Sequence, residues 1–137
     1  MKALLVNMNE TPKVIDVEDA PSYQVYAEIL GCEFVEHHAL GQDIAIYIDE
    51  TGRLKYYDDP EGTTQPNRAL YTQDDRCFDV IFGNFIIVGT SEDGDDIGLK
   101  QWMTDELFKR LANPSTGKLE VDKDREKFAP SWSITTL

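Results

Sequence analysis

The chain has 137 residues, the ordinary length of one domain, and 41% of them are hydrophobic, which is enough for one core and too many for a disordered chain. Acidic residues outnumber basic residues by 26 to 13, and the formal net charge is −13. Such a surface repels the phosphates of DNA and RNA, so we expect no direct binding to nucleic acid. No apolar run approaches the roughly 20 residues of a membrane-spanning helix, and the apolar start of the chain ends at Asn7 without a cleavage site. We therefore expect a cytoplasmic protein that does not bind membranes.

The first part of the chain predicts two strands followed by a helix. Strands are expected over residues 2–7 and 12–17, and the second is rich in the β-branched side chains that strands favour. The helix is expected to follow an N-cap at Asp19 and to end at Gly31. Its buried face is expected to consist of residues at helical spacing, namely Tyr23, Tyr26, Ala27 and Leu30.

The next segment predicts a strand over residues 43–50, preceded by a weaker strand over residues 32–38. Side chains of the stronger strand alternate between two faces because successive residues of a strand point in opposite directions. One face is expected to carry Ile44, Ile46 and Ile48, and the other Ala45 and Tyr47.

Local signals beyond this strand predict a hairpin and a loop. Residues 51–52 predict a turn, after which residues 53–57 are expected to return as the partner strand. Two prolines and a glycine predict a loop over residues 58–66, and residues 67–70 are expected to form a short helical turn.

The most apolar stretch of the chain covers residues 78–89. It predicts one central strand, or two strands separated by a bulge or bend at Gly83-Asn84. The acidic residues 91–96 are expected to form a loop that caps the following helix. That helix is expected to bury a stripe of Leu99, Trp102, Met103, Leu107 and Leu111.

These elements predict the α+β class, with a mostly antiparallel sheet and two helices packed on it in a single domain. Residues 1–112 are expected to form the domain. Residues 113–137 have little periodicity, and they are expected to form a C-terminal extension that is flexible or draped on the domain.

Candidate catalytic and metal-binding residues do not converge in the sequence. His37 and His38 are adjacent on a predicted strand and therefore diverge, whereas a zinc site needs about four converging ligands. The acidic loop lacks the ligand spacing of a calcium-binding loop. Cys32 and Cys77 are expected to be reduced, buried thiols. We therefore expect no metal, no cofactor and no catalytic activity.

One group of residues, Asn67, Arg68 and Asp79, is a candidate ligand-binding site. In the structural interpretation, which we favour, Arg68 pairs with Asp79 or Asp43 and Asn67 caps a turn. In the functional interpretation, the arginine fork beside an amide binds a small anionic ligand or the phosphate of a nucleotide.

Acidic residues are concentrated in two loops. One loop carries Asp58, Asp59 and Glu61, and the other carries Glu92, Asp93, Asp95 and Asp96. The commoner reason for such acidity is solubility. The alternative is an acidic face that binds a basic surface on another protein, such as one that normally holds DNA.

Several segments, taken in their order, resemble those of a known family. They are Met1–Val6, Pro12–Ile15, Asp43–Ala45, Glu50–Arg53, Pro66–Ala69 and Asp79–Gly89, followed by the acidic loop and the last helix. The most specific parts are the Asn-Arg-Ala turn at 67–69 and the strand that carries Asp79, Ile81, Gly83 and Phe85. Over roughly residues 1–112 the chain is similar to the domain-of-unknown-function family numbered 3846, which is carried by phages, plasmids and other bacterial mobile elements. The resemblance implies a small mobile-element protein with no established reaction and no catalytic residues to transfer.

The charge and the resemblance together predict a non-catalytic interaction protein that inhibits or modulates a host or defence protein through its acidic face. The alternative is a sponge-like protein that binds a small molecule or nucleotide with Asn67 and Arg68.

Overall fold

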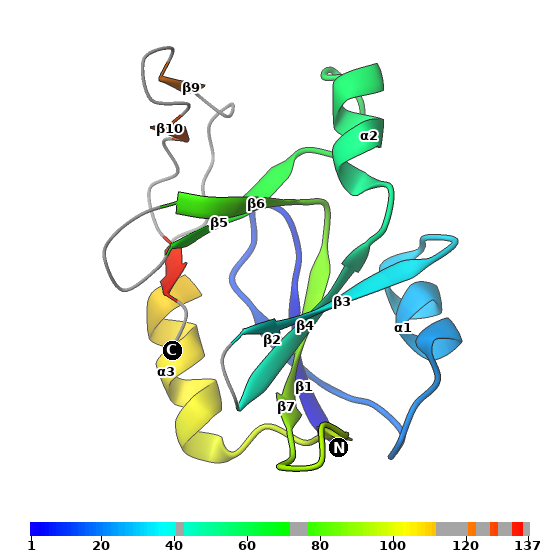
Figure 1. The fold of residues 1–137 in the computed structure, drawn as a ribbon, viewed down its shortest axis with the longest axis vertical. Helices are drawn as coiled ribbons and strands as arrows, with labels where there is room; N and C mark the ends of the chain where they lie inside the picture. The colour runs from blue at the N-terminus through cyan, green and yellow to red at the C-terminus, as the bar shows by residue number, and fades with distance from the viewer. Residues whose placement is uncertain (41–42, 72–76, 112–120, 123–126, 129–132, 136–137) are drawn as a thin grey trace.

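The computed structural model describes residues 1–40, 43–71, 77–111, 121–122, 127–128 and 133–135. Its main sheet has six strands, five of them in the order β2-β1-β7-β4-β3, while β8 pairs with β7. The bounds are β1 Lys2–Val6, β2 Lys13–Asp16, β3 Val35–Leu40, β4 Ile44–Asp49, β7 Phe85–Thr90 and β8 Asp96–Ile97. All of these pairings are antiparallel, and the sheet runs through the centre of the molecule (Figure 1).

A second sheet has the order β11-β5-β6. It consists of β5 Pro66–Tyr71, antiparallel to β6 Cys77–Phe82, and β11 Ser133–Thr135, parallel to β5. The short strands β9 Val121–Asp122 and β10 Lys127–Phe128 pair with each other. The helices are α1 Tyr23–Leu30, α2 Gly52–Asp58 and α3 Gln101–Leu111. The predicted α+β fold with a mostly antiparallel sheet is confirmed, with α2 as a third helix.

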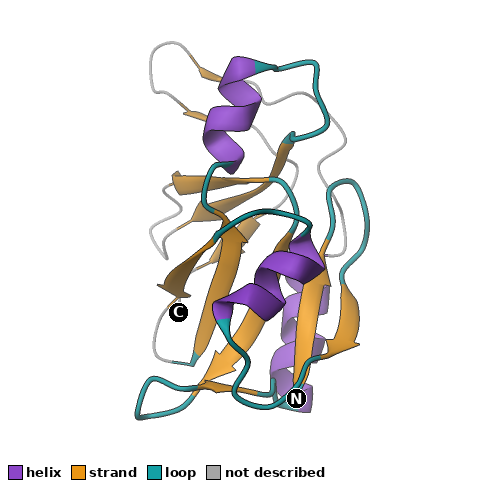
Figure 2. Cartoon of the chain, turned by 90° about the vertical axis from the view of Figure 1, so that its right-hand side faces the viewer, coloured by secondary structure: helices purple, strands orange, loops and turns teal. Residues whose placement is uncertain are grey.

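The two faces of the main sheet carry separate hydrophobic clusters. On one face Ile44, Ile46 and Ile48 pack with Met103 and Leu107 of α3, and Leu70 and Ile81 of the second sheet join the same cluster. On the other face Ala45 and Tyr47 pack with Tyr26 and Ala27 of α1. The predicted alternation of β4 is therefore confirmed, and each face is covered by its own helix. Figure 2 shows α1 in front of the sheet and α3 behind it.

Helix α1 ends as predicted but begins differently. Gly31 has a φ of +69° and its N–H donates to the carbonyl of Glu28, as is typical of a left-handed residue that ends a helix. The N-cap is Ser22, whereas the predicted cap, Asp19, contacts the amino group of Met1 at 3.3 Å. Tyr26 and Ala27 are buried, but Tyr23 is 56% exposed, so the predicted buried face is shorter than expected.

Two predictions in the middle of the chain are wrong. The expected return strand is helix α2, because Tyr56 packs on Phe82 at a ring distance of 5.1 Å while Leu54 and Tyr57 are exposed. This is a helical pattern of burial and not an alternating one. The expected helical turn at 67–70 is strand β5, because it pairs with β6 along most of its length. In both cases a contact with β6 overrides the local signal.

The apolar stretch forms two strands, β6 and β7, as one of the two alternatives predicts, and they belong to different sheets. The predictions for the following segment need two corrections. Strand β8 separates the acidic loop from α3, so this loop does not cap the helix. Trp102 is 57% exposed, whereas Leu99, Met103, Leu107 and Leu111 are buried as expected. Earlier in the chain, Cys32, which was predicted to be buried, is half-buried.

The side chain of Cys77 and most of the predicted extension over residues 113–137 lie outside the described residues. Among the residues that are described, no helix is both long and apolar enough to cross a membrane.

Gly83 is expected to be needed for the turn from one sheet into the other. Its φ is +83°, and an added Cβ would meet only the Thr64 methyl group at an ordinary 3.6 Å, so a substitution introduces backbone strain and not a collision. We expect Gly83→Val to lower the free energy of unfolding by about 2–3 kcal/mol in a denaturant titration. Gly83→Asn should cost less because asparagine adopts positive φ more readily. Equal losses in the two variants would contradict the role of φ.

Candidate functional site

A cavity of about 490 Å³ lies between α1, the main sheet and the loop that joins β7 to β8. We call it the tyrosine pocket. It is lined by Ala20, Pro21, Tyr23, His37, Tyr47, Gly94, Asp95 and Asp96. These residues come from four separate parts of the chain, so the pocket exists only in the folded protein.

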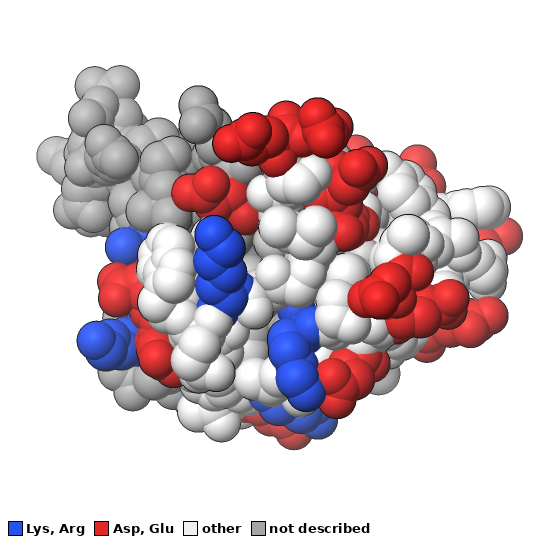
Figure 3. Space-filling model, turned by 90° about the horizontal axis from the view of Figure 1, so that it is seen from below, with Lys and Arg blue, Asp and Glu red and all other residues white. Residues whose placement is uncertain are grey.

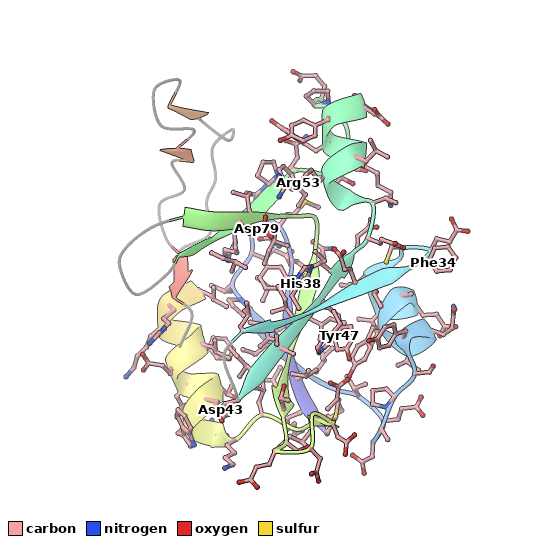
Figure 4. The ribbon with its side chains drawn as sticks, viewed as in Figure 1. Phe34, His38, Asp43, Tyr47, Arg53 and Asp79 are labelled. Atoms are coloured by element: carbon pink, nitrogen blue, oxygen red, sulfur yellow. The ribbon has the colours of Figure 1, made fainter. Side chains whose placement is uncertain are left out.

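Tyr47 is the central side chain of the pocket. It is buried on the α1 face of β4 and stacks on Tyr26, with ring centroids 3.9 Å apart. Tyr23 contacts the same ring edge-on at 5.4 Å, and His37 of the neighbouring strand contacts it at 5.2 Å. Tyr23 and Tyr26 lie three positions apart on α1, and this spacing places both on the side of the helix that faces Tyr47. Figure 4 labels Tyr47, which lies between β4 and α1.

Asp96 is fixed by two of these tyrosines. The hydroxyls of Tyr26 and Tyr47 donate to its Oδ2 at 2.8 and 2.5 Å. Burial, and then hydrogen bonding to Asp96, raise the pKa of both tyrosines well above the ordinary value. Both hydroxyls therefore remain neutral donors, and they orient the carboxylate without cancelling its charge.

The loop from β7 to β8 holds further carboxylates beside the pocket. Glu92, Asp93 and Asp95 are exposed. Ser91 shapes the loop because its hydroxyl accepts a hydrogen bond from the backbone N–H of Asp95 at 3.0 Å, and its own N–H donates to the carbonyl of Asp95 at 2.9 Å. Glu18 and Asp19, also exposed, directly precede the pocket residue Ala20. Figure 3 shows this lower end of the molecule, where acidic side chains form several groups with fewer basic ones among them.

The seven acidic residues predicted to form one partner-binding face are separated in space. Glu92, Asp93, Asp95 and Asp96 lie at the lower end of the molecule, in or beside the β7–β8 loop, whereas Asp58, Asp59 and Glu61 lie at the upper end with α2 and the loop after it (Figure 1). The predicted single face therefore consists of two separate acidic regions, one at each end of the molecule. Only the lower one borders the tyrosine pocket.

Asn67 and Arg68 are buried, with exposed fractions of 2% and 1%. The guanidinium of Arg68 donates to the carbonyls of Glu10 and Leu111 at 3.0 and 3.1 Å, and to Asn67 Oδ1 at 2.9 Å. Asn67 Nδ2 donates to the carbonyls of Val6 and Gly83, both at 2.9 Å. Burial lowers the pKa of Arg68 to about 10. The structural interpretation is favoured, although Asn67 joins strands and does not cap a turn.

Asp79 accepts a hydrogen bond from Arg53 at 2.6 Å, so its described ion pair differs from the predicted one with Arg68. Arg53 and Asp79 line a second cavity of about 200 Å³, together with His38. His38 lies 3.0 Å from Glu36, while His37 lies at the tyrosine pocket, so the two histidines diverge as predicted. Figure 4 labels Arg53, Asp79 and His38. Among the described residues, no group of three or more His, Cys, Asp or Glu could hold a metal ion.

The sequence interpretation missed the tyrosine pocket. The helical spacing of Tyr23 and Tyr26 and the inward position of Tyr47 were both readable. However, the hydrogen bonds of Tyr26 and Tyr47 to Asp96 join residues that are 70 and 49 positions apart, and no local pattern encodes such contacts. A buried tyrosine that needs a partner for its hydroxyl was the one available signal.

The fold and the pocket define a small α+β protein with an acidic, aromatic-lined cavity. The sequence profile of the family described as Domain of unknown function (DUF3846) matches residues 1–112, and the chain belongs to this family. No curated protein and no solved structure matches the chain.

Replacing Arg68 should test whether it supports the fold. We expect Arg68→Ala to destabilise the protein by about 3 kcal/mol, because several buried acceptors lose their donor. Arg53→Ala is the control, since Arg53 forms a half-exposed ion pair and should cost less than about 1 kcal/mol. A thermal melt of Arg68→Ala that matches the wild type would contradict the structural role.

Asp96 is expected to matter more for stability than its neighbour Asp95. We expect Asp96→Ala to cost about 2 kcal/mol because two tyrosine hydroxyls lose a charged acceptor. Asp95→Ala removes an exposed carboxylate and should change stability by less than about 0.5 kcal/mol. Chemical denaturation of both variants makes the comparison, and equal effects would show that the hydroxyl bonds contribute little.

Proposed function

We propose that this protein is a non-catalytic interaction protein that binds a basic surface on another protein through its lower acidic end. The observation that carries the proposal is the grouping of Glu92, Asp93 and Asp95 beside the tyrosine pocket. Among the described residues, none forms an ion pair with these three carboxylates. Exposed aromatic side chains next to such carboxylates are suited to a basic partner, because the rings supply contact area and the charges supply attraction.

The net charge of the chain supports the same choice of partner. A formal charge of −13 attracts basic surfaces over distances comparable to the Debye length, about 8–10 Å at physiological salt, and repels nucleic acid. The mobile-element origin implied by the sequence resemblance suggests a finer version, in which the partner is a host or defence protein whose activity is inhibited or modulated.

Burial of Asn67 and Arg68 disfavours the alternative, a nucleotide-binding protein that uses these two residues. A phosphate could reach the Arg68 guanidinium only if its bonds to the carbonyls of Glu10 and Leu111 were given up. The free energy of such a rearrangement would be subtracted from the binding energy.

Two matched charge variants test the proposal. The first carries Glu92→Gln, Asp93→Asn and Asp95→Asn at the lower end, and leaves Asp96 because two tyrosines depend on it. The second carries Asp58→Asn, Asp59→Asn and Glu61→Gln at the upper end. Both remove the same charge, so a difference between them reports position and not total charge.

The partner is first sought by affinity capture from bacterial lysate at low salt, and its binding kinetics are then measured for both variants. We expect the lower variant to slow association roughly tenfold, with the wild-type rate falling steeply as salt increases. The upper variant should change the rate much less. If a captured partner binds both variants alike and is indifferent to salt, the acidic-end mechanism is wrong.

A further inference from the structure

We infer that the tyrosine pocket binds an arginine side chain of the partner protein. The inference rests on the proposed function, because it names the group that a basic partner would place in the pocket. It goes beyond that function by assigning a specific site and a specific chemistry.

The charge of the pocket selects a cation. Asp95 and Asp96 both line it, and Asp96 is bonded by neutral hydroxyls. Some other carboxylates of the fold are neutralised by basic side chains, as in the pairs of Asp16 with Lys2 at 2.7 Å and of Asp49 with Lys55 at 2.6 Å. The described hydrogen bonds of Asp96 therefore orient its carboxylate but do not compensate its negative charge. An anionic ligand would be repelled by this charge.

The aromatic walls favour a flat cation that stacks. Tyr23 is 56% exposed, and its ring lies at 75° to the buried ring of Tyr47, so Tyr23 supplies the accessible tyrosine surface of the cavity. A cation over the face of a tyrosine is attracted by the ring quadrupole. Guanidinium is planar, weakly hydrated and able to donate two parallel hydrogen bonds to a carboxylate, whereas ammonium is a strongly hydrated point charge.

The same arrangement already occurs elsewhere in this chain. The guanidinium carbon of Arg53 lies 5.2 Å from the centre of the Phe82 ring, and the same guanidinium donates to Asp79 at 2.6 Å. One arginine thus contacts a ring and a carboxylate at once. The tyrosine pocket supplies both of these surfaces, an exposed ring from Tyr23 and a carboxylate from Asp95 or Asp96.

Short peptides provide a direct test. The probes are acetyl-Gly-Arg-Gly-amide and acetyl-Gly-Lys-Gly-amide, titrated into ¹⁵N-labelled full-length protein and followed by NMR. We expect the arginine peptide to bind with a dissociation constant on the order of millimolar and to shift the amide signals of residues 94–96. The lysine peptide should bind several-fold more weakly. Absence of a saturable shift, or equal or tighter binding of the lysine peptide, would overturn the inference.

Two exposed tyrosines on helices give a matched control. Tyr23→Ala should weaken binding of the arginine peptide roughly tenfold, and Tyr23→Phe should retain most of it because the ring remains. Tyr57→Ala on α2 should have no effect, although Tyr57 is 58% exposed and so resembles Tyr23 in accessibility. Equal effects of Tyr23→Ala and Tyr57→Ala would reject the pocket.

The proposed function can survive the failure of this inference. If no arginine peptide binds, but a captured partner still distinguishes the lower charge variant from the upper one, the acidic end is correct and the arginine pocket is wrong. If the partner does not distinguish the two variants either, both are wrong.

Discussion

The buried contact between Asn67 and Arg68 joins the two sheets of this protein, and the remaining architecture depends on it. Arg68 bonds the main chain at Glu10 and Leu111, and Asn67 bonds the main chain at Val6 and Gly83. These carbonyls belong to β1, the segment after it, the break between β6 and β7, and the end of α3. A buried cation is costly unless it is well bonded, so its geometry leaves little freedom in how these segments meet.

Once the sheets are joined, the different side chains on the two faces of β4 and β7 determine where the tyrosine pocket can form. Strand β7 lies between β1 and β4, and its residues alternate between the α3 cluster and the α1 cluster. The α3 face is closed by aliphatic side chains and the second sheet. The α1 face contains Tyr26 and Tyr47, whose hydroxyls need partners, and Asp96 at the end of β7's hairpin with β8 supplies one. The pocket thus forms at the edge of the core, where buried tyrosine hydroxyls need a hydrogen-bond acceptor.

Much of the main sheet was predictable because its signals are local. The alternation of residues 44–48, the helical spacing before Gly31 and the break at Gly83 each follow from periodicity or glycine alone. Helix α2 and strand β5 were not predictable in this way, since contact with β6 decides both. The prediction of the site was incomplete for a related reason. The acidic loops were evident in the sequence, but their separation to opposite ends of the molecule depends on distant segments. The contact of Tyr47 with Asp96 depends on distant segments as well.

How each carboxylate is bonded distinguishes two groups of acidic residues in this fold. Some carboxylates pair with lysine or arginine, namely those of Asp16, Asp49 and Asp79. Their charges are largely compensated by these partners and screened at the protein surface. Asp96 is held by hydroxyls that fix its position and leave its charge in place. Glu92, Asp93 and Asp95 form no ion pair with the described residues, so their charges repel one another in the free protein, and a cationic partner would relieve this repulsion. A purely solubilising surface has no need of such an orientation, because solubility depends on charge and not on where a single oxygen points. The two tyrosine hydroxyls on one oxygen satisfy a structural need of the core, and they also leave the charge of Asp96 in place for the cationic partner that we propose.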